Sequence, residues 1–112
     1  MYKNYKEKEE DFEKTLIKKY IDEFTIERLV SDRLPVNNFS VELKETILDG
    51  LLMKTYESID GEYYWIKTIA EYENFTVEKT KRILEELFAE NLIELVIFHY
   101  GSNYEFLCCK LK

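Results

Sequence analysis

Three cations lie close together near the start of a segment whose residue pattern predicts a helix. With the residue expected to cap that helix, the candidate contact residues are Thr76, Lys79, Lys81 and Arg82. Lysine binds phosphate as a point charge, and an arginine guanidinium can donate two parallel hydrogen bonds to the edge of a guanine. The set could therefore touch a polyanion. The alternative is an ordinary solvated helix face, because the second half of the same helix is acidic and contains Glu85, Glu86 and Glu90.

The chain lacks a recognisable catalytic or metal-binding constellation. Its single histidine, His99, lies in a β-rich run, where a packed or surface residue is more common than a catalytic base, and there is no glycine-rich phosphate loop. Cys108 and Cys109 are neighbours in a predicted strand, so their side chains point to opposite faces and cannot easily bond each other or share a metal ion. We predict two buried thiols, a solvated Glu85–Glu86 pair, no cofactor, no metal site and no enzymatic activity.

Composition limits the chain to one acidic domain. The 112 residues include three Gly and one Pro, and 46% are hydrophobic, which is enough apolar surface for a compact fold. The formal net charge is −7, from 16 Lys and Arg against 23 Asp and Glu, and this excludes a strongly basic scaffold. Residues 35–75 carry much of the excess acid, with 3 cations and 8 acidic residues, so the cations near Thr76 lie outside the most acidic part.

The N-terminal sequence alternates in charge and lacks the apolar core of a signal peptide. No apolar run approaches the roughly 18 residues that a membrane span requires. We therefore expect a cytoplasmic protein.

Hydrophobic periodicity divides the chain at Pro35. The spacing of the first apolar stripe predicts an N-terminal helix within residues 1–34, which Pro35 ends. That stripe consists of Phe12, Leu16, Ile17, Tyr20, Ile21 and Phe24. Residues 35–112 should form the main domain. Its expected elements are a helix from Ser40 to about Ser58, a strand over 62–66, a helix over 67–73, a helix from Thr76 to about Asn91, and strands over 92–100 and 104–111.

The last two strands should form a hairpin. A two-residue loop at 101–102 would place Ile97 opposite Phe106 on one face. This face should be buried. The other face carries Phe98 and Tyr100 and is too apolar to stay in water, so we expect something to cover it.

The order of elements resembles that of the winged helix-turn-helix superfamily: helix, short strand, short helix, tight turn, longer helix and two-stranded hairpin. The most telling stretch is 69–94, IAEYENFTVEKTKRILEELFAENLIE. Ala70 is small where two helices would cross closely, and Asn74 and Asn91 stand at turns where the family usually has glycine. Thr80 departs from the aliphatic residue that the family normally has there. The implied fold is α+β and mostly helical, a winged helix with an extra N-terminal helix and a C-terminal hairpin wing.

The resemblance implies a DNA-binding regulator of transcription or replication. Such proteins lay the longer helix in the major groove of duplex DNA, which would bring Thr76, Lys79, Lys81 and Arg82 to the contact. However, the predicted hairpin tip carries no Lys or Arg, whereas a wing that grips phosphate is usually basic. The alternative is a protein-interaction module, such as a small regulator or inhibitor from a virus or mobile element, that keeps the winged shape without binding DNA.

The N-terminal stripe predicts a further contact, because it is more apolar than a tail requires. Together with the uncovered hairpin face, it favours a homodimer. The candidate contact residues are Phe12, Leu16, Tyr20, Phe24, Phe98 and Tyr100. The expected partners are thus duplex DNA, a second copy of the chain or another protein, and no membrane.

Overall fold

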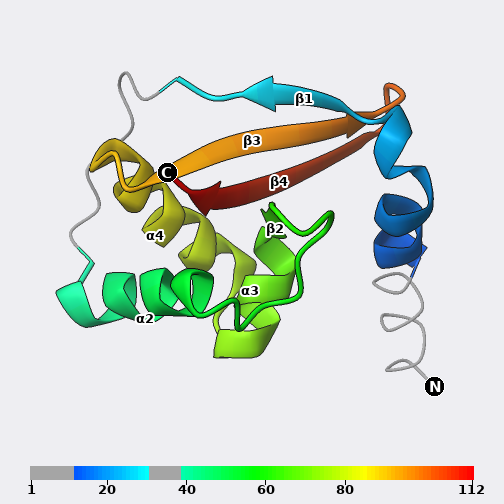
Figure 1. Cartoon of the computed structure of the whole chain (residues 1–112). Helices are drawn as coiled ribbons and strands as arrows, with labels where there is room; N and C mark the ends of the chain where they lie inside the picture. The colour runs from blue at the N-terminus through cyan, green and yellow to red at the C-terminus, as the bar shows by residue number, and fades with distance from the viewer. Residues whose placement is uncertain (1–11, 31–38) are drawn as a thin grey trace.

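The computed structural model describes residues 12–30 and 39–112, which form an α+β domain with one antiparallel sheet. Figure 1 shows the sheet above the helices α2, α3 and α4. The strand order is β1-β3-β4-β2. After a helix over residues 12–20, the elements are the 3-10 helix η1 (Ile21–Glu23), β1 (Thr25–Arg28), α2 (Val41–Leu52), β2 (Tyr64–Trp65), α3 (Ile66–Glu73), α4 (Val77–Ala89), β3 (Ile93–Tyr100) and β4 (Tyr104–Leu111).

The elements expected between Ser40 and residue 111 are present, and α2 is shorter than predicted. The Ser40 side chain accepts a hydrogen bond from the Leu43 N–H, which caps α2 as expected. The helix ends at Leu52 instead of near Ser58, because Lys54 adopts a left-handed conformation with φ 55° that cannot continue a helix. The chain then turns inward, and Tyr56 is buried against the helices.

The N-terminal segment is not one long helix, which corrects the prediction for residues 1–34. The helix ends at residue 20, and Thr25–Arg28 forms β1, which pairs with β3 so that Thr25 lies opposite His99. Thr25 and Ile26 are β-branched and suit a strand, and the edge of β3 offers them backbone partners. Residues 1–11 and 31–34 of the predicted helix lie outside the described residues.

The hairpin register differs by one residue from the prediction. Tyr100 pairs with Tyr104 and Phe98 with Phe106, which leaves residues 101–103 as a three-residue loop. Gly101, the first loop residue, adopts φ 61°, a left-handed conformation that costs glycine little. Phe106 therefore shares a face with Phe98 and not with Ile97.

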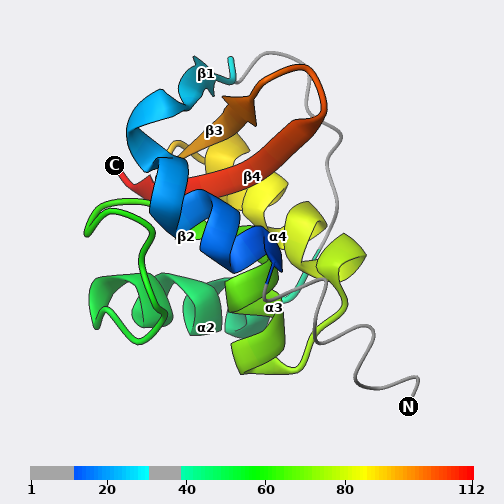
Figure 2. The ribbon, with the colours of Figure 1, turned by 90° about the vertical axis from the view of Figure 1, so that its right-hand side faces the viewer.

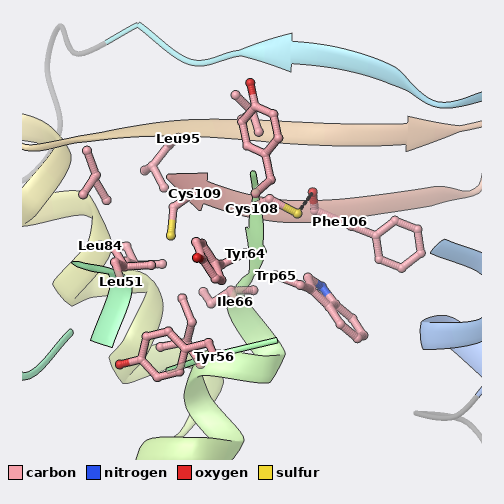
Figure 3. Close-up of a cluster of buried hydrophobic side chains, with 14 of the residues drawn as sticks. Leu51, Tyr56, Tyr64, Trp65, Ile66, Leu84, Leu95, Phe106, Cys108 and Cys109 are labelled. Atoms are coloured by element: carbon pink, nitrogen blue, oxygen red, sulfur yellow. Dashed lines mark hydrogen bonds between the residues drawn. The ribbon is translucent and has the colours of Figure 1, made fainter. Parts of the chain in front are cut away.

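The core lies between the helices and the sheet and contains both cysteines (Figure 3). Cys108 and Cys109 are fully buried free thiols, as predicted, and the Cys108 Sγ donates to the Phe106 carbonyl at 3.5 Å. Burial raises the pKa of both thiols, that of Cys109 to about 12. Neutral thiols in this core act as small apolar groups and are poor nucleophiles.

Residues 12–30, here called the N-terminal arm, cover the hairpin face that carries Phe98 and Tyr100. In Figure 2 the helix over 12–20 lies against the hairpin. Its Tyr20 ring lies 5.3 Å from that of Tyr100, and Phe24 lies 6.1 Å from Phe98 between ring centroids. The hairpin face that we expected to be covered is thus covered by the N-terminal arm of the same chain.

Candidate nucleic-acid interface

The α3–α4 corner is built by local signals that the sequence shows. Asn74 ends α3 with φ 59° and ψ 40°, the left-handed conformation expected at a position where glycine is common. The Thr76 side chain then accepts a hydrogen bond from the Lys79 N–H at 3.1 Å and caps α4. Ala70, on α3, is 3% exposed, in agreement with the small residue expected at a close helix crossing. The corner therefore fixes the direction in which α4 begins.

The three cations predicted to make contact all lie on the first two turns of α4. The Lys79 ammonium lies 4.4 Å from the centroid of the Phe75 ring, a cation–π contact that holds it beside the corner. Lys81 is exposed. The Arg82 Nη2 lies 3.2 Å from the Glu78 Oε1, an exposed pair one turn apart that contributes little to stability.

Lys79 and Lys81 differ from most other cations in the described ranges. Neither makes an ion pair with any residue in 12–30 or 39–112, whereas seven of the twelve described Lys and Arg residues do. The start of α4 also carries the positive end of the helix dipole. This short surface can therefore attract an anion in a protein whose total charge is negative.

The second half of α4 is not a plain solvated acidic face, and the prediction for Glu86 was wrong. Glu86 is 7% exposed, and both of its carboxylate oxygens accept from the Phe39 N–H, at 3.1 and 3.3 Å. The Lys44 Nζ lies 3.9 Å from Glu86 and 2.5 Å from Glu90. The hydrogen bond to Glu90 raises the pKa of Lys44. Glu86 is a structural residue that fastens the start of the α2 region to α4, and no local sequence pattern reveals the Phe39 N–H that it binds.

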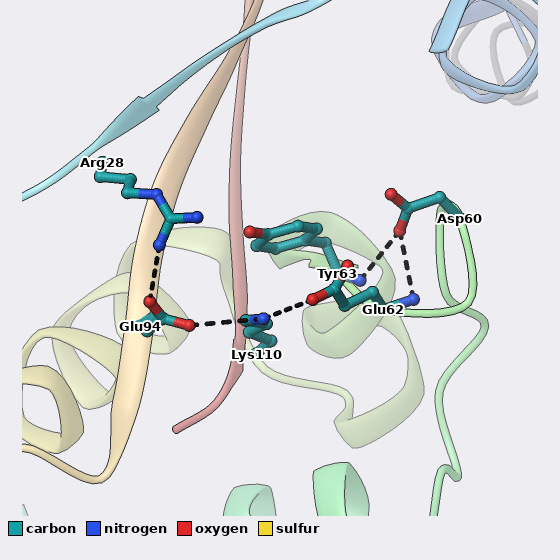
Figure 4. A network of polar contacts seen from close by, with 6 residues as sticks. All are labelled: Arg28, Asp60, Glu62, Tyr63, Glu94 and Lys110. Carbon is teal, nitrogen blue, oxygen red and sulfur yellow. Dashed lines mark hydrogen bonds and ion pairs between the residues drawn. The ribbon is translucent and has the colours of Figure 1, made fainter. Parts of the chain in front are cut away.

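The hairpin offers little to a phosphate backbone. Within β3 and β4 the one Lys or Arg is Lys110, and it is engaged in a polar network across the sheet (Figure 4). Lys110 pairs with Glu62 and lies 3.5 Å from Glu94, which in turn binds Arg28 of β1 at 3.0 Å. The hydrogen bond to Glu62 raises the pKa of Lys110, which keeps this lysine charged and paired.

His99 sits between two carboxylates near the hairpin tip. Its Nε2 lies 2.7 Å from Glu27 of β1, and its Nδ1 lies 3.7 Å from Glu105 of β4. The imidazole thus links the edge strand to the hairpin.

The six residues predicted to contact a partner are largely used within the chain. Leu16 is 8% and Phe98 1% exposed, and Tyr20, Phe24 and Tyr100 pack on one another as described above. Phe12 is the exception at 55% exposed. The homodimer stays a prediction, but the apolar stripe and the hairpin face that motivated it cover each other.

No family model, curated protein or solved structure matches the chain. Among the described residues, no group of His, Cys, Asp and Glu side chains gathers in a way that could hold a metal ion. None of the helices in this part of the chain has the length and apolar composition needed to cross a membrane.

Proposed function

We propose that the chain is a winged-helix regulator that contacts duplex DNA through the start of α4. The order α2, β2, α3, α4, β3, β4 supports the winged-helix assignment, as does the tight corner at Asn74. The observation that carries DNA binding is the placement of three cations at the start of α4: Lys81 and Arg82 are exposed and Lys79 is half-buried. The two lysines have no carboxylate partner in the described residues.

The contact is expected to be small and sharply placed. Lys79 and Lys81 would bind phosphates, and Arg82 would exchange Glu78 for a guanine edge in the major groove. The rest of the surface is too acidic to coat DNA without regard to sequence, since the formal net charge is −7. Binding should therefore need a preferred site, as expected of a regulator of transcription or replication.

The test compares two triple variants that each remove three positive charges. Lys79→Ala/Lys81→Ala/Arg82→Ala alters the start of α4, and the matched control neutralises Lys19, Lys54 and Lys112, which also make no ion pair in the described part of the chain. Duplexes selected from a randomised pool by the wild type are titrated at several salt concentrations. The α4 variant should lose most of the affinity for DNA. Its plot of log affinity against log salt should become shallower, with the magnitude of the negative slope reduced by about two or three.

The control variant should keep more of the DNA affinity and more of the salt dependence, because the cations that it removes lie outside the start of α4. Equal losses in the two variants would mean that only the total charge matters. Failure of the wild type to select any duplex at low salt would overturn DNA binding.

A protein-interaction role is the second candidate. The observation that favours it is the hairpin, whose tip lacks cations and whose one lysine within the strands, Lys110, is paired. A wing of this kind cannot grip phosphates as basic wings do. If no duplex is selected, this second function becomes the better proposal.

A further inference from the structure

We propose that the groove between α4 and the sheet binds a protein segment whose apolar side chains are flanked by Lys or Arg. The groove has a volume of about 300 Å³. Its walls and floor include Leu29, Lys81, Glu85, Ile97, Glu105 and Leu107. This inference does not depend on DNA binding, although Lys81, one of the three proposed DNA-contact cations, also lines the groove.

The floor of the groove is apolar because α4 covers only part of this sheet face. Ile97 pairs with Leu107 across the two central strands, so their side chains share a face. Both are only partly buried. By contrast, Leu95 on the same face is 1% exposed. Two large aliphatic side chains in the middle of a sheet thus remain partly open to water, which is typical of a surface that a partner covers.

Carboxylates on opposite walls determine the charge that a partner needs. Glu85 lies on α4 and makes no ion pair with any residue that the structure describes. Glu105 lies on β4, and its neighbour is His99 at 3.7 Å. Glu27 projects from β1 on the same face as Ile97. Lys81 is the one Lys or Arg among the groove residues.

The complementary occupant is therefore basic and partly apolar. Its Lys or Arg side chains would approach Glu85 and Glu105, while its apolar side chains would cover Ile97 and Leu107. A DNA backbone does not fit this description, because its phosphates would meet carboxylates on both walls. The groove and the start of α4 thus meet at Lys81, but their other charged residues suit different partners.

The experiment uses the full chain and a short amphipathic peptide of Leu and Lys, with a Leu and Glu peptide of the same pattern as the opposite-charge probe. Binding is followed by amide shifts in two-dimensional NMR at low salt. The Leu/Lys peptide should move the amides around Ile97, Glu105 and Leu107 and in the middle of α4. Glu85→Gln/Glu105→Gln should weaken binding by about tenfold, as expected for the loss of two rim charges.

A matched variant, Glu45→Gln/Asp49→Asn, removes two exposed acids from α2 and should bind as the wild type does. Ile97→Thr/Leu107→Thr should weaken binding by a similar factor while the duplex affinity is kept, which separates this site from the proposed DNA contact. The proposal is overturned if the Leu/Lys peptide causes no saturable shifts in the groove, or if the Leu/Glu peptide binds with the same affinity. It is also overturned if the Leu/Lys peptide binds Glu85→Gln/Glu105→Gln and Glu45→Gln/Asp49→Asn with equal affinity.

Discussion

Replacing Gly50 by alanine should destabilise the domain, although alanine is the better helix former. Gly50 lies within α2, and a Cβ built on it would lie 2.2 Å from the Oη and 2.4 Å from the Cζ of Tyr56. The ring has little room to retreat, because it is 3% exposed and its hydroxyl donates a 2.7 Å hydrogen bond to the Glu73 carboxylate. The substitution would force the ring away from α2 or break its bond to α3.

The expected loss follows from three opposing effects. Alanine gains about 1 kcal/mol over glycine within a helix. Overpacking a well-filled core costs about 1–3 kcal/mol, and a hydrogen bond to a charged group contributes about 1.5–3 kcal/mol. We therefore expect Gly50→Ala to lower the free energy of unfolding by about 2–4 kcal/mol and the Tm by about 10 °C or more.

Urea unfolding measures this change, with Trp65 as the probe because it is the single tryptophan and is 4% exposed. The same substitution is then made in a Tyr56→Leu background, in which the clashing ring is absent. There Gly50→Ala should stabilise the protein through helix propensity alone, so the sign of its effect reverses. A Gly50→Ala protein as stable as the wild type, or equal losses in both backgrounds, would refute the reasoning.

Three further predictions concern the corner, the buried acid and the thiols. Glu86→Gln should lower the free energy of unfolding by about 1–3 kcal/mol because it weakens a buried charged hydrogen bond, whereas the same change at Glu85 should stay within about 0.5 kcal/mol in urea unfolding. Asn74→Gly should be neutral or stabilising, and Asn74→Ala should cost about 1 kcal/mol because alanine resists a positive φ, as thermal unfolding would show. The folded pKa values of Cys108 and Cys109 are raised, so stability is full below the unfolded thiol pKa of about 8.5 and should fall as pH rises above it. Urea unfolding between neutral and alkaline pH should show a shallower fall in Cys109→Ala, and an equal fall would contradict the assignment.

The corner could be predicted from sequence because its determinants are local. A capping threonine at 76, an asparagine able to adopt a positive φ at 74 and the apolar face of α4 all act within a few residues of one another. The cations on the first two turns follow directly from that helix. The candidate contact was therefore predictable as a set of residues. That Lys79 and Lys81 form no ion pair within the described residues was not predictable.

The features that sequence reasoning missed depend on distant partners. Thr25–Arg28 follows a helical stripe, and it becomes a strand because β3 offers an edge. In the sequence, Glu86 resembles any exposed acid on a helix. Its role depends on the hydrogen bond from the Phe39 N–H, which lies 47 residues away in the chain. The hairpin register depends on whether the loop has two or three residues, and the sequence does not decide between them. In the structure Asn103 belongs to the loop and does not pair with β3. A one-residue shift moves Phe106 to the other face, so that the burial predicted for the Ile97 face was only partly right.

The ion pairs explain why the net charge alone is a poor guide to binding. Most other cations in the described chain form ion pairs, and some of these hold elements together, as Lys67 does with Glu13 of the N-terminal arm and Arg28 with Glu94 of β3. Such cations are already matched and add little attraction for a phosphate. Lys79 and Lys81 lie two residues apart on α4, and neither forms an ion pair with any residue in 12–30 or 39–112. An acidic protein can therefore present a positive start of α4 beside an acidic groove, because the local pairing of charges, and not their sum, decides what each surface attracts.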